Sequence, residues 1–180
     1  HLTGLANRRE FERFMEREVA LAERHERRLT MMMIDLDNLK RINDRQGHRG
    51  GDAALRLVGQ QLQRVVRSSD LCARIGGDEF AVAMPETDME RGREVAARLR
   101  AAVREMSLAA KTIEAVEVSV GLSAWRPGQD WPAVYQNADT DLYEDKKLRK
   151  LALRGERGGE RTPMALFPRA GGVRRRVAGS

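Results

Sequence analysis

Cysteine and long apolar runs are both scarce in this sequence, and each shortage excludes a class of protein. The 180 residues contain one cysteine, Cys72, so an internal disulfide and a disulfide-stapled fold are excluded. We expect Cys72 to be a small core residue rather than a nucleophile, since it lies in an apolar run. No apolar run approaches the roughly 20 residues that cross a bilayer. No signal peptide opens the chain, which begins with His1, so we expect the cytoplasmic part of a longer protein.

Positive charge is concentrated at the C-terminal end. The formal net charge is +6. Residues 151–180 hold seven arginines and two glutamates, 7 − 2 = +5, which leaves 6 − 5 = +1 for residues 1–150. A nearly neutral body argues against a nucleic acid polymer as the partner. Because residues 151–180 also hold six glycines and two prolines, we expect one folded domain over residues 1–150 and a largely disordered basic tail after it.

The spacing of apolar residues predicts a mixed fold. Helical spacing predicts helices over Asn7–Arg27, Ala53–Val66, Asp88–Met106 (with Asp88 as N-cap) and Trp131–Lys150. Short apolar runs predict strands at Leu29–Leu36, Leu71–Ile75, Phe80–Met84 and Val116–Trp125. This order predicts an α+β sandwich in which helices flank a central, mostly antiparallel sheet.

Two glycines and two acids, Gly76-Gly77-Asp78-Glu79, separate two of these strands. The glycine pair suits a tight hairpin, because both residues tolerate φ > 0. A hairpin does not need two carboxylates at its tip, and like charges repel unless a cation lies between them. The residues alone leave two interpretations open, a solvated turn and a metal site.

A second pair of acids, Asp35 and Asp37, ends the apolar run Leu29–Leu36. Alternation along a strand places both side chains on one face. A carboxylate at the end of a buried strand is costly unless it binds something, and hard oxygen ligands suit Mg²⁺ or Mn²⁺. For Asp35 we favour a metal shared with Asp78. For Asp37 we favour a helix N-cap, with Asn38 as the alternative cap.

These motifs, taken in order, resemble the GGDEF domain, the catalytic domain of diguanylate cyclases, from Leu2 to about Lys150. The matching segments are Leu2–Phe11, Ile34–Asp44, Gly47–Asp52, Gly76–Phe80, Val118–Leu122 and Ala138–Tyr143. The resemblance implies the palm-like fold of nucleotidyl cyclases. It also implies an enzyme that condenses two GTP molecules into cyclic di-GMP and two pyrophosphates where two copies of the domain meet, under the control of an upstream sensor or dimerisation domain.

The resemblance also implies a set of active-site residues. Asp35, Asp78 and the carbonyl of Leu36 would hold Mg²⁺ or Mn²⁺, with two ions per site, because phosphoryl transfer depends on positioning and charge neutralisation. Asp78 or Glu79 would take the proton of the 3′-hydroxyl, and the sequence leaves that choice open. The residues expected to meet phosphate are Lys40, Lys146 and Lys150.

Guanine recognition is implied for a third group of residues. Asp52 would accept hydrogen bonds from the N1–H and 2-amino donors of guanine, and Asn43 would donate to an acceptor on the base. An N-cap of the following helix is the alternative for Asp52. His48 would lie near the nucleotide, with a structural role as its alternative.

An Arg-x-x-Asp motif, Arg67 to Asp70, lies shortly before the signature, where many family members bind product as an inhibitor. Arginine can pair with phosphate or with the Hoogsteen edge of guanine. Arg98, on the next helix, would contribute to this inhibitory site. A simple ion pair at a helix end is the alternative.

The last helix departs from the family pattern. Asp141 and Asp145 replace alanines that would pack, Arg149 replaces a glycine, and Lys150 replaces an arginine. We expect these changes to weaken docking of the helix and triphosphate affinity. A catalytically silent receptor that binds cyclic di-GMP through Arg67 and Asp70 is the alternative function, although the intact Asp35, Asp78 and Glu79 favour an enzyme.

Overall fold

The computed structural model describes residues 2–110 and 115–158, with side chains as far as Leu151. Its elements are β1 (Ala6–Asn7), α1 (Arg8–His25), β2 (Leu29–Leu36), α2 (Leu39–Val65), β3 (Leu71–Arg74), β4 (Glu79–Pro85), α3 (Met89–Ala109), β5 (Val118–Ala124) and α4 (Trp131–Gly158). The predicted helices and strands are thus present, and β1 is an addition too short to leave an apolar pattern. Within this range no helix is long and apolar enough to span a bilayer.

The five strands form one sheet in the order β1-β3-β4-β2-β5. The pairs β2–β4, β2–β5 and β3–β4 are antiparallel, and β1–β3 is parallel. This confirms the predicted α+β sandwich with a mostly antiparallel sheet. The strand β2 is central and buried along its whole length, whereas β5 is an edge strand.

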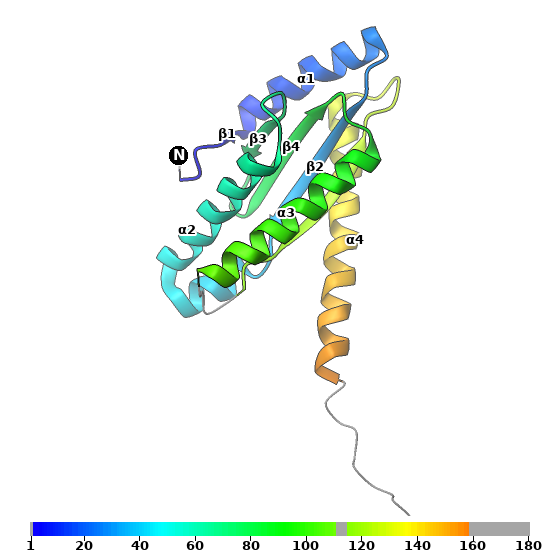
Figure 1. Cartoon of the computed structure of the whole chain (residues 1–180). Coiled ribbons are helices and arrows are strands. Elements are labelled where there is room, and N and C mark those ends of the chain that lie inside the picture. The colour runs from blue at the N-terminus through cyan, green and yellow to red at the C-terminus, as the bar shows by residue number, and fades with distance from the viewer. Residues whose placement is uncertain (1, 111–114, 159–180) are drawn as a thin grey trace, which may run out of the picture.

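Alternation along β2 divides the core into two layers, one on each face of the sheet. Met32, Ile34 and Leu36 pack with α2 and α3, while Met31 and Met33 pack with α1 and α4. In Figure 1, α2 and α3 lie in front of the sheet, and the C-terminal half of α4 extends beyond it. Asp35 follows Met31 and Met33 in this alternation, so its side chain belongs to the face covered by α1 and α4.

Local capping signals set the ends of two helices. Asn7 and Glu10 form a capping box at the start of α1, with bonds of 3.0 and 2.8 Å. The predicted cap of α3 is confirmed, because the Asp88 side chain accepts from the Arg91 amide at 2.9 Å.

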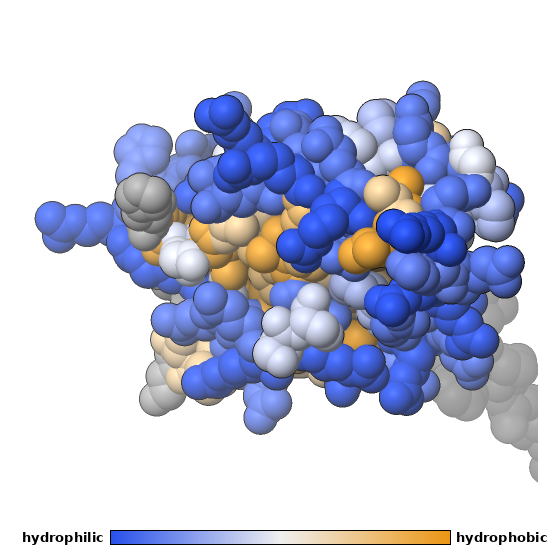
Figure 2. Space-filling model, turned by 90° about the horizontal axis from the view of Figure 1, so that it is seen from above, coloured by the Kyte–Doolittle hydropathy of each residue, from blue (hydrophilic) through white to orange (hydrophobic). Residues whose placement is uncertain are grey.

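Hydrophilic side chains cover most of the surface in Figure 2, and apolar surface shows between them in the middle of that view.

Two helix boundaries differ from the prediction. The element α2 consists of two helical segments separated by a kink at Gly47, where φ is 69° and ψ is 176°. Only glycine adopts that conformation readily, so the first segment ends at Gly47 and the second begins before Ala53, the predicted start. At the C-terminus α4 continues to Gly158 instead of ending at Lys150, since Leu151 to Arg154 favour helix. Residues 159–180 of the predicted tail lie outside the described residues.

The single cysteine is part of the core. Cys72 lies in β3 with 8% of its surface exposed, and burial raises the pKa of its thiol to about 12. A thiol with that pKa stays protonated at neutral pH, which confirms a packing role and excludes a thiolate nucleophile.

Candidate functional site

Acids from two neighbouring strands meet at one end of the sheet. The antiparallel register pairs Asp35 of β2 directly with Glu79 of β4, so their side chains leave the same face. The adjacent residue, Asp78, accepts a hydrogen bond from the Leu36 amide through its carbonyl at 3.0 Å. The sheet therefore brings the signature acids to the end of the buried strand β2, as the sequence predicts.

The carboxylate of Asp35 is buried, with 8% of the residue exposed, and it has a cation beside it. Lys146 of α4 lies 2.8 Å from it, Nζ to Oδ2. Burial raises the pKa of the Asp35 carboxyl, Lys146 opposes that rise, and the charge of Asp78 adds to it. Asp35 and Asp78 are thus close enough to repel one another, and a cation at Asp35 is electrostatically favourable.

The glycines of the signature do not act as predicted. Neither Gly76 nor Gly77 has φ > 0, so the expectation of a turn that depends on positive φ at both residues is wrong. A Cβ at Gly76 would collide with the carboxylate of Glu79, whose own Cβ would lie 3.2 Å from it. The space beside Gly76 is therefore occupied by the Glu79 side chain, whose carboxylate would have to move for a larger residue, while a Cβ at Gly77 would meet nothing within 4 Å.

A cavity of about 280 Å³ opens beside these acids. Its lining includes the predicted metal and phosphate residues Asp35, Leu36, Asp78, Lys40, Lys146 and Lys150. Asn38, Leu39, Asp37, Glu117 and Arg149 complete the lining. The carboxylates of Asp35 and Asp78 and the carbonyl of Leu36 are hard oxygen donors that suit Mg²⁺ or Mn²⁺. Residues 2–110 and 115–151 contain no group of three or more acidic, His or Cys side chains arranged to hold a metal ion, so phosphate oxygens or water would have to complete its coordination.

Asp37 does not cap α2, which corrects the prediction. The N-cap position belongs to Asn38, which is left-handed (φ 61°) and makes no side-chain cap bond. Asp37 instead accepts from the Ser119 hydroxyl at 2.8 Å and faces Arg149 at 3.4 Å, Nε to Oδ2. Its contact with α4 places it on the same face as Asp35, as the alternation predicts.

The kinked helix α2 holds the residues expected to bind guanine. A Cβ at Gly51 would collide with the Asn43 side chain, so Asn43 lies against the backbone next to Asp52. Asp52 lies inside the second segment of α2 rather than at its start, because that segment begins directly after Gly47, and the N-cap alternative for Asp52 is wrong. His48 is exposed just after the kink. None of these three residues lines the 280 Å³ cavity.

The predicted inhibitory residues lie together at a second cavity, of about 300 Å³, between the end of α2 and α3. Arg67, Asp70 and Arg98 all line it. The Asp70 carboxylate accepts from the Arg67 amide at 3.0 Å, and Arg98 donates to the Val65 carbonyl at 3.1 Å. Two arginines that sequence reasoning missed, Arg64 and Arg91, line the same cavity and make it strongly basic.

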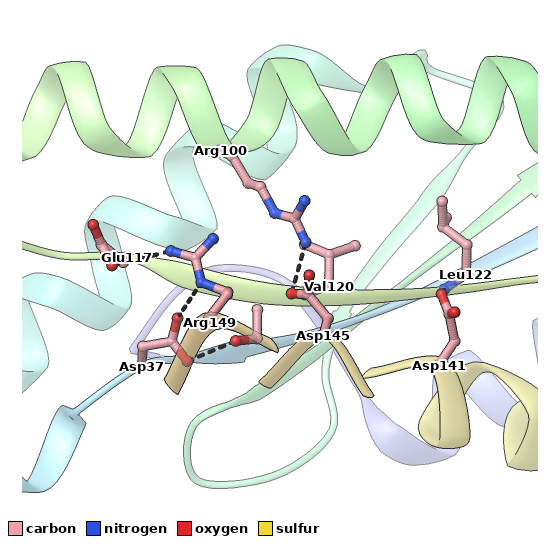
Figure 3. Close-up of polar contacts among 9 residues, drawn as sticks. Asp37, Arg100, Glu117, Val120, Leu122, Asp141, Asp145 and Arg149 are labelled. Atoms are coloured by element: carbon pink, nitrogen blue, oxygen red, sulfur yellow. Dashed lines mark hydrogen bonds and ion pairs between the residues drawn. The ribbon is translucent and has the colours of Figure 1, made fainter. Parts of the chain in front are cut away.

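The last helix is held against β5 by the residues that were expected to loosen it. Asp141 accepts from the Leu122 amide at 2.7 Å, and Asp145 accepts from the Val120 amide at 2.9 Å (Figure 3). These amides point away from β2, because β5 is an edge strand. Asp141 and Asp145 are four residues apart in the helix, a rise of about 6 Å, and Val120 and Leu122 are two residues apart in the strand, a rise of about 6.8 Å. The two aspartates are therefore spaced like the two amides that they bind.

A glycine makes this close approach possible. A Cβ at Gly121 would collide with the Ala138 carbonyl and the Leu142 amide, and it would lie 2.7 Å from the Leu142 Cα. The helix backbone therefore rests directly on β5, where a short aspartate reaches the strand amides. The prediction that Asp141 and Asp145 weaken the docking of α4 is wrong, because they bond to the strand edge instead of filling alanine positions in the core.

Comparison with known proteins places the chain in a family. The model of the family "Diguanylate cyclase, GGDEF domain" matches residues 1–150. Over 147 residues the chain is 37% identical to Diguanylate cyclase DgcP of Pseudomonas aeruginosa, and the aligned region covers 81% of this chain and 22% of that protein. Over 148 residues it is 38% identical to Diguanylate cyclase DosC of Escherichia coli, and the aligned region covers 81% of this chain and 32% of that protein. The chain thus spans a third or less of these two relatives.

Solved structures share the fold. The GGDEF domain of DgcB from Caulobacter crescentus, in complex with c-di-GMP, aligns with a TM-score of 0.77 at 31% identity, covering 82% of this chain and 88% of that one. Diguanylate cyclase SiaD of P. aeruginosa, in complex with its activator SiaC, aligns with a TM-score of 0.76 at 33% identity, covering 81% and 56%. The sheet that joins the signature to β2 is therefore a shared architecture, and the chain belongs to the GGDEF domain family of diguanylate cyclases.

Proposed function

We propose that this domain is a diguanylate cyclase, which joins two GTP molecules into cyclic di-GMP and releases two pyrophosphates. The observation that carries the proposal is the buried carboxylate of Asp35, opposite Glu79 and near Asp78, at the mouth of a lysine-lined cavity. Acids and lysines together suit a metal-bound triphosphate, because the acids attract the cation and the lysines attract phosphate. The relatives named above carry the same activity in their names.

In this proposal Asp35, Asp78 and the Leu36 carbonyl hold Mg²⁺ or Mn²⁺, with two ions in the complete site. The bound metal would neutralise triphosphate charge and make the 3′-hydroxyl more acidic. The ammonium of Lys146, which now neutralises Asp35 at 2.8 Å, is then released to bind phosphate. Lys40 and Lys150, which line the same cavity, supply further positive charge.

Proton removal and base recognition fall to neighbouring groups. Glu79 or Asp78 accepts the proton of the attacking 3′-hydroxyl. Asp52 and Asn43 bind the guanine edge, and His48 lies beside the nucleotide. An adenine would leave Asp52 without the 2-amino donor, at a cost of about 1–3 kcal/mol for an unpaired buried acceptor. Guanine is preferred for that reason.

Activity is proposed to require two copies of the domain. The 3′-hydroxyl of one nucleotide attacks the α-phosphorus of the other, so two cavities must face one another. An upstream domain of the longer cytoplasmic protein would bring the copies together. The product would bind as an inhibitor in the cavity lined by Arg67, Asp70 and Arg98. The arginines would pair with its phosphates, and the carboxylate would accept hydrogen bonds from its guanine edges.

Turnover by concentrated or artificially dimerised protein tests this proposal. Incubation with GTP and Mg²⁺ is expected to give cyclic di-GMP and pyrophosphate, detected by liquid chromatography and a coupled pyrophosphate assay. Asp78→Ala is expected to abolish both products, while Asp139→Ala, which removes an exposed carboxylate of α4, is expected to leave turnover unchanged. Binding of cyclic di-GMP without turnover by the wild-type dimer would support the receptor alternative instead.

A further inference from the structure

Arg149 bridges two acids beside the cavity. Its Nη2 lies 3.0 Å from Glu117 Oε2, and its Nε lies 3.4 Å from Asp37 Oδ2. The Asp37 amide also donates to the Glu117 carbonyl at 2.9 Å, so the two acids are backbone neighbours. Figure 3 shows the guanidinium between them, projecting from α4 toward the start of β5. The arginine thus ties together the segment after β2, the segment before β5 and α4.

Asp37 is placed where a metal ligand of this site could lie, but both oxygens of its carboxylate already contact protein donors. It lies two residues from Asp35 on the same face, lines the same cavity, and its charge raises the pKa of the Asp35 carboxyl. Both of its carboxylate oxygens are already engaged: Oδ1 accepts from the Ser119 hydroxyl at 2.8 Å, and Oδ2 faces Arg149. These contacts fix the orientation of the carboxylate, so coordination of the cation by Asp37 would require it to turn and to weaken them.

The two ion pairs of α4 differ in how readily a cation displaces them. Asp35 is paired with Lys146, whose ammonium is a flexible point charge that a divalent ion can replace. Asp37 is held by the Ser119 hydroxyl and by a guanidinium that Glu117 also fixes in place, so its release breaks two contacts. Displacement therefore breaks one printed contact at Asp35 and two at Asp37.

We propose that Arg149 is a positioning residue that withholds Asp37 from the divalent cation, and so leaves the metal to Asp35, Asp78 and the substrate. The inference rests on the proposed metal-dependent function and adds a residue that determines coordination. Arg149 reaches Asp37 because it follows Asp141 and Asp145 at four-residue steps, on the stripe of α4 that is fixed to β5. Three of the four substitutions in this helix, Asp141, Asp145 and Arg149, thus lie on one face and fix its contacts with β5 and Asp37.

Metal binding to the purified, nucleotide-free protein tests this inference without any need for turnover. Mn²⁺ affinity is measured by isothermal titration, and the number of metal-bound waters by the luminescence lifetime of Eu³⁺ in H₂O and D₂O. In Arg149→Ala we expect Mn²⁺ to bind about tenfold more tightly and about one water fewer, because a freed carboxylate replaces water. Arg149→Ala combined with Asp37→Asn is expected to regain the wild-type water count. Lys147→Ala removes an exposed charge of the same helix and is the matched control, expected to keep both values.

Asp37→Asn alone is the decisive variant if Arg149→Ala does not fold. Since Asp37 is withheld in the wild type, this change is expected to leave Mn²⁺ affinity within about threefold and the water count unchanged. An extra bound water in Asp37→Asn would show that Asp37 is already a ligand, and it would overturn the inference. An unchanged water count in a folded Arg149→Ala protein would do the same. Failure of the wild-type protein to bind Mn²⁺ would instead overturn the proposed metal site, and the inference with it.

Discussion

One carboxylate, that of Asp145, joins three elements of the fold, and its removal is the sharpest test of how α4 is held. Its Oδ2 accepts from the Val120 amide of β5 at 2.9 Å and from Arg100 Nη2 of α3 at 2.7 Å. Asp145→Ala leaves a strand amide and a guanidinium without this partner. Val120 is 5% exposed, so water replaces the lost acceptor poorly.

The cost can be estimated bond by bond. A hydrogen bond to a charged group, lost from a buried amide, is worth about 1.5–3 kcal/mol. The Arg100–Asp145 pair has side chains 36% and 22% exposed, so solvent screening limits it to about 0.5 kcal/mol. Asp145→Ala is therefore expected to lower the free energy of unfolding by about 2–3.5 kcal/mol, which corresponds to a fall in Tm of roughly 4–14 °C.

Urea unfolding of matched variants measures this difference. Asp145→Asn keeps an oxygen for the Val120 amide and loses the charge, so about half of the destabilisation is expected. Asp139→Ala, on an exposed position of the same helix, is the control and is expected to change stability by less than about 0.5 kcal/mol. If Asp145→Ala proved no less stable than Asp139→Ala, the Asp145 bonds would not contribute to holding α4, and the reasoning would be refuted.

Two further predictions follow from packing and burial. Gly121→Ala is expected to destabilise the fold by about 3 kcal/mol or more, because its Cβ would meet the backbone of α4. Gly77→Ala is the control: the space around its Cβ is open, so it should unfold like the wild type in the same urea titration. Asp35→Asn is expected to stabilise the metal-free protein at neutral pH, because burial raises the pKa of Asp35 in the folded state. Wild-type stability therefore falls as pH rises from the unfolded value of about 3.9 through the raised folded value. The gap between the two proteins should widen as pH rises above about 4, level off above the folded pKa, and close when Mg²⁺ is added in excess.

The fold was largely predictable because its signals are local. The apolar run Leu29–Leu36 gave the bounds of β2, and Asp88 marked the start of α3 through a cap that spans only three residues. The acids of the site were also predictable, because Asp35 and Asp78 end or precede strands that the antiparallel register then brings together. Such inferences need only the alternation along a strand and the pairing of neighbours.

The errors concern side-chain contacts that no local pattern in the sequence shows. A glycine pair in a turn suggests positive φ, but the reason for Gly76 is the carboxylate of Glu79, which folds back over it. Asp37 resembles a helix cap until Arg149 of α4 is seen beside it. One signal in the sequence was available: Asp141, Asp145 and Arg149 recur at four-residue steps and define one polar stripe on a helix that was expected to pack through alanines.

The stripe that fixes α4 to the sheet also orients Lys146, the lysine proposed to bind phosphate. Neighbouring residues of a helix point about 100° apart, so once Asp145 faces the edge of β5, Lys146 must turn toward β2, where it meets Asp35. Register along α4 and charge at the metal site are therefore not independent. A helix docked by alanines could slide or rotate slightly at little cost, whereas one bonded to alternate amides of β5 has a single register, since a shift of one residue breaks both bonds. Loosening of the Asp145 bond should consequently weaken GTP binding by more than the loss of global stability explains.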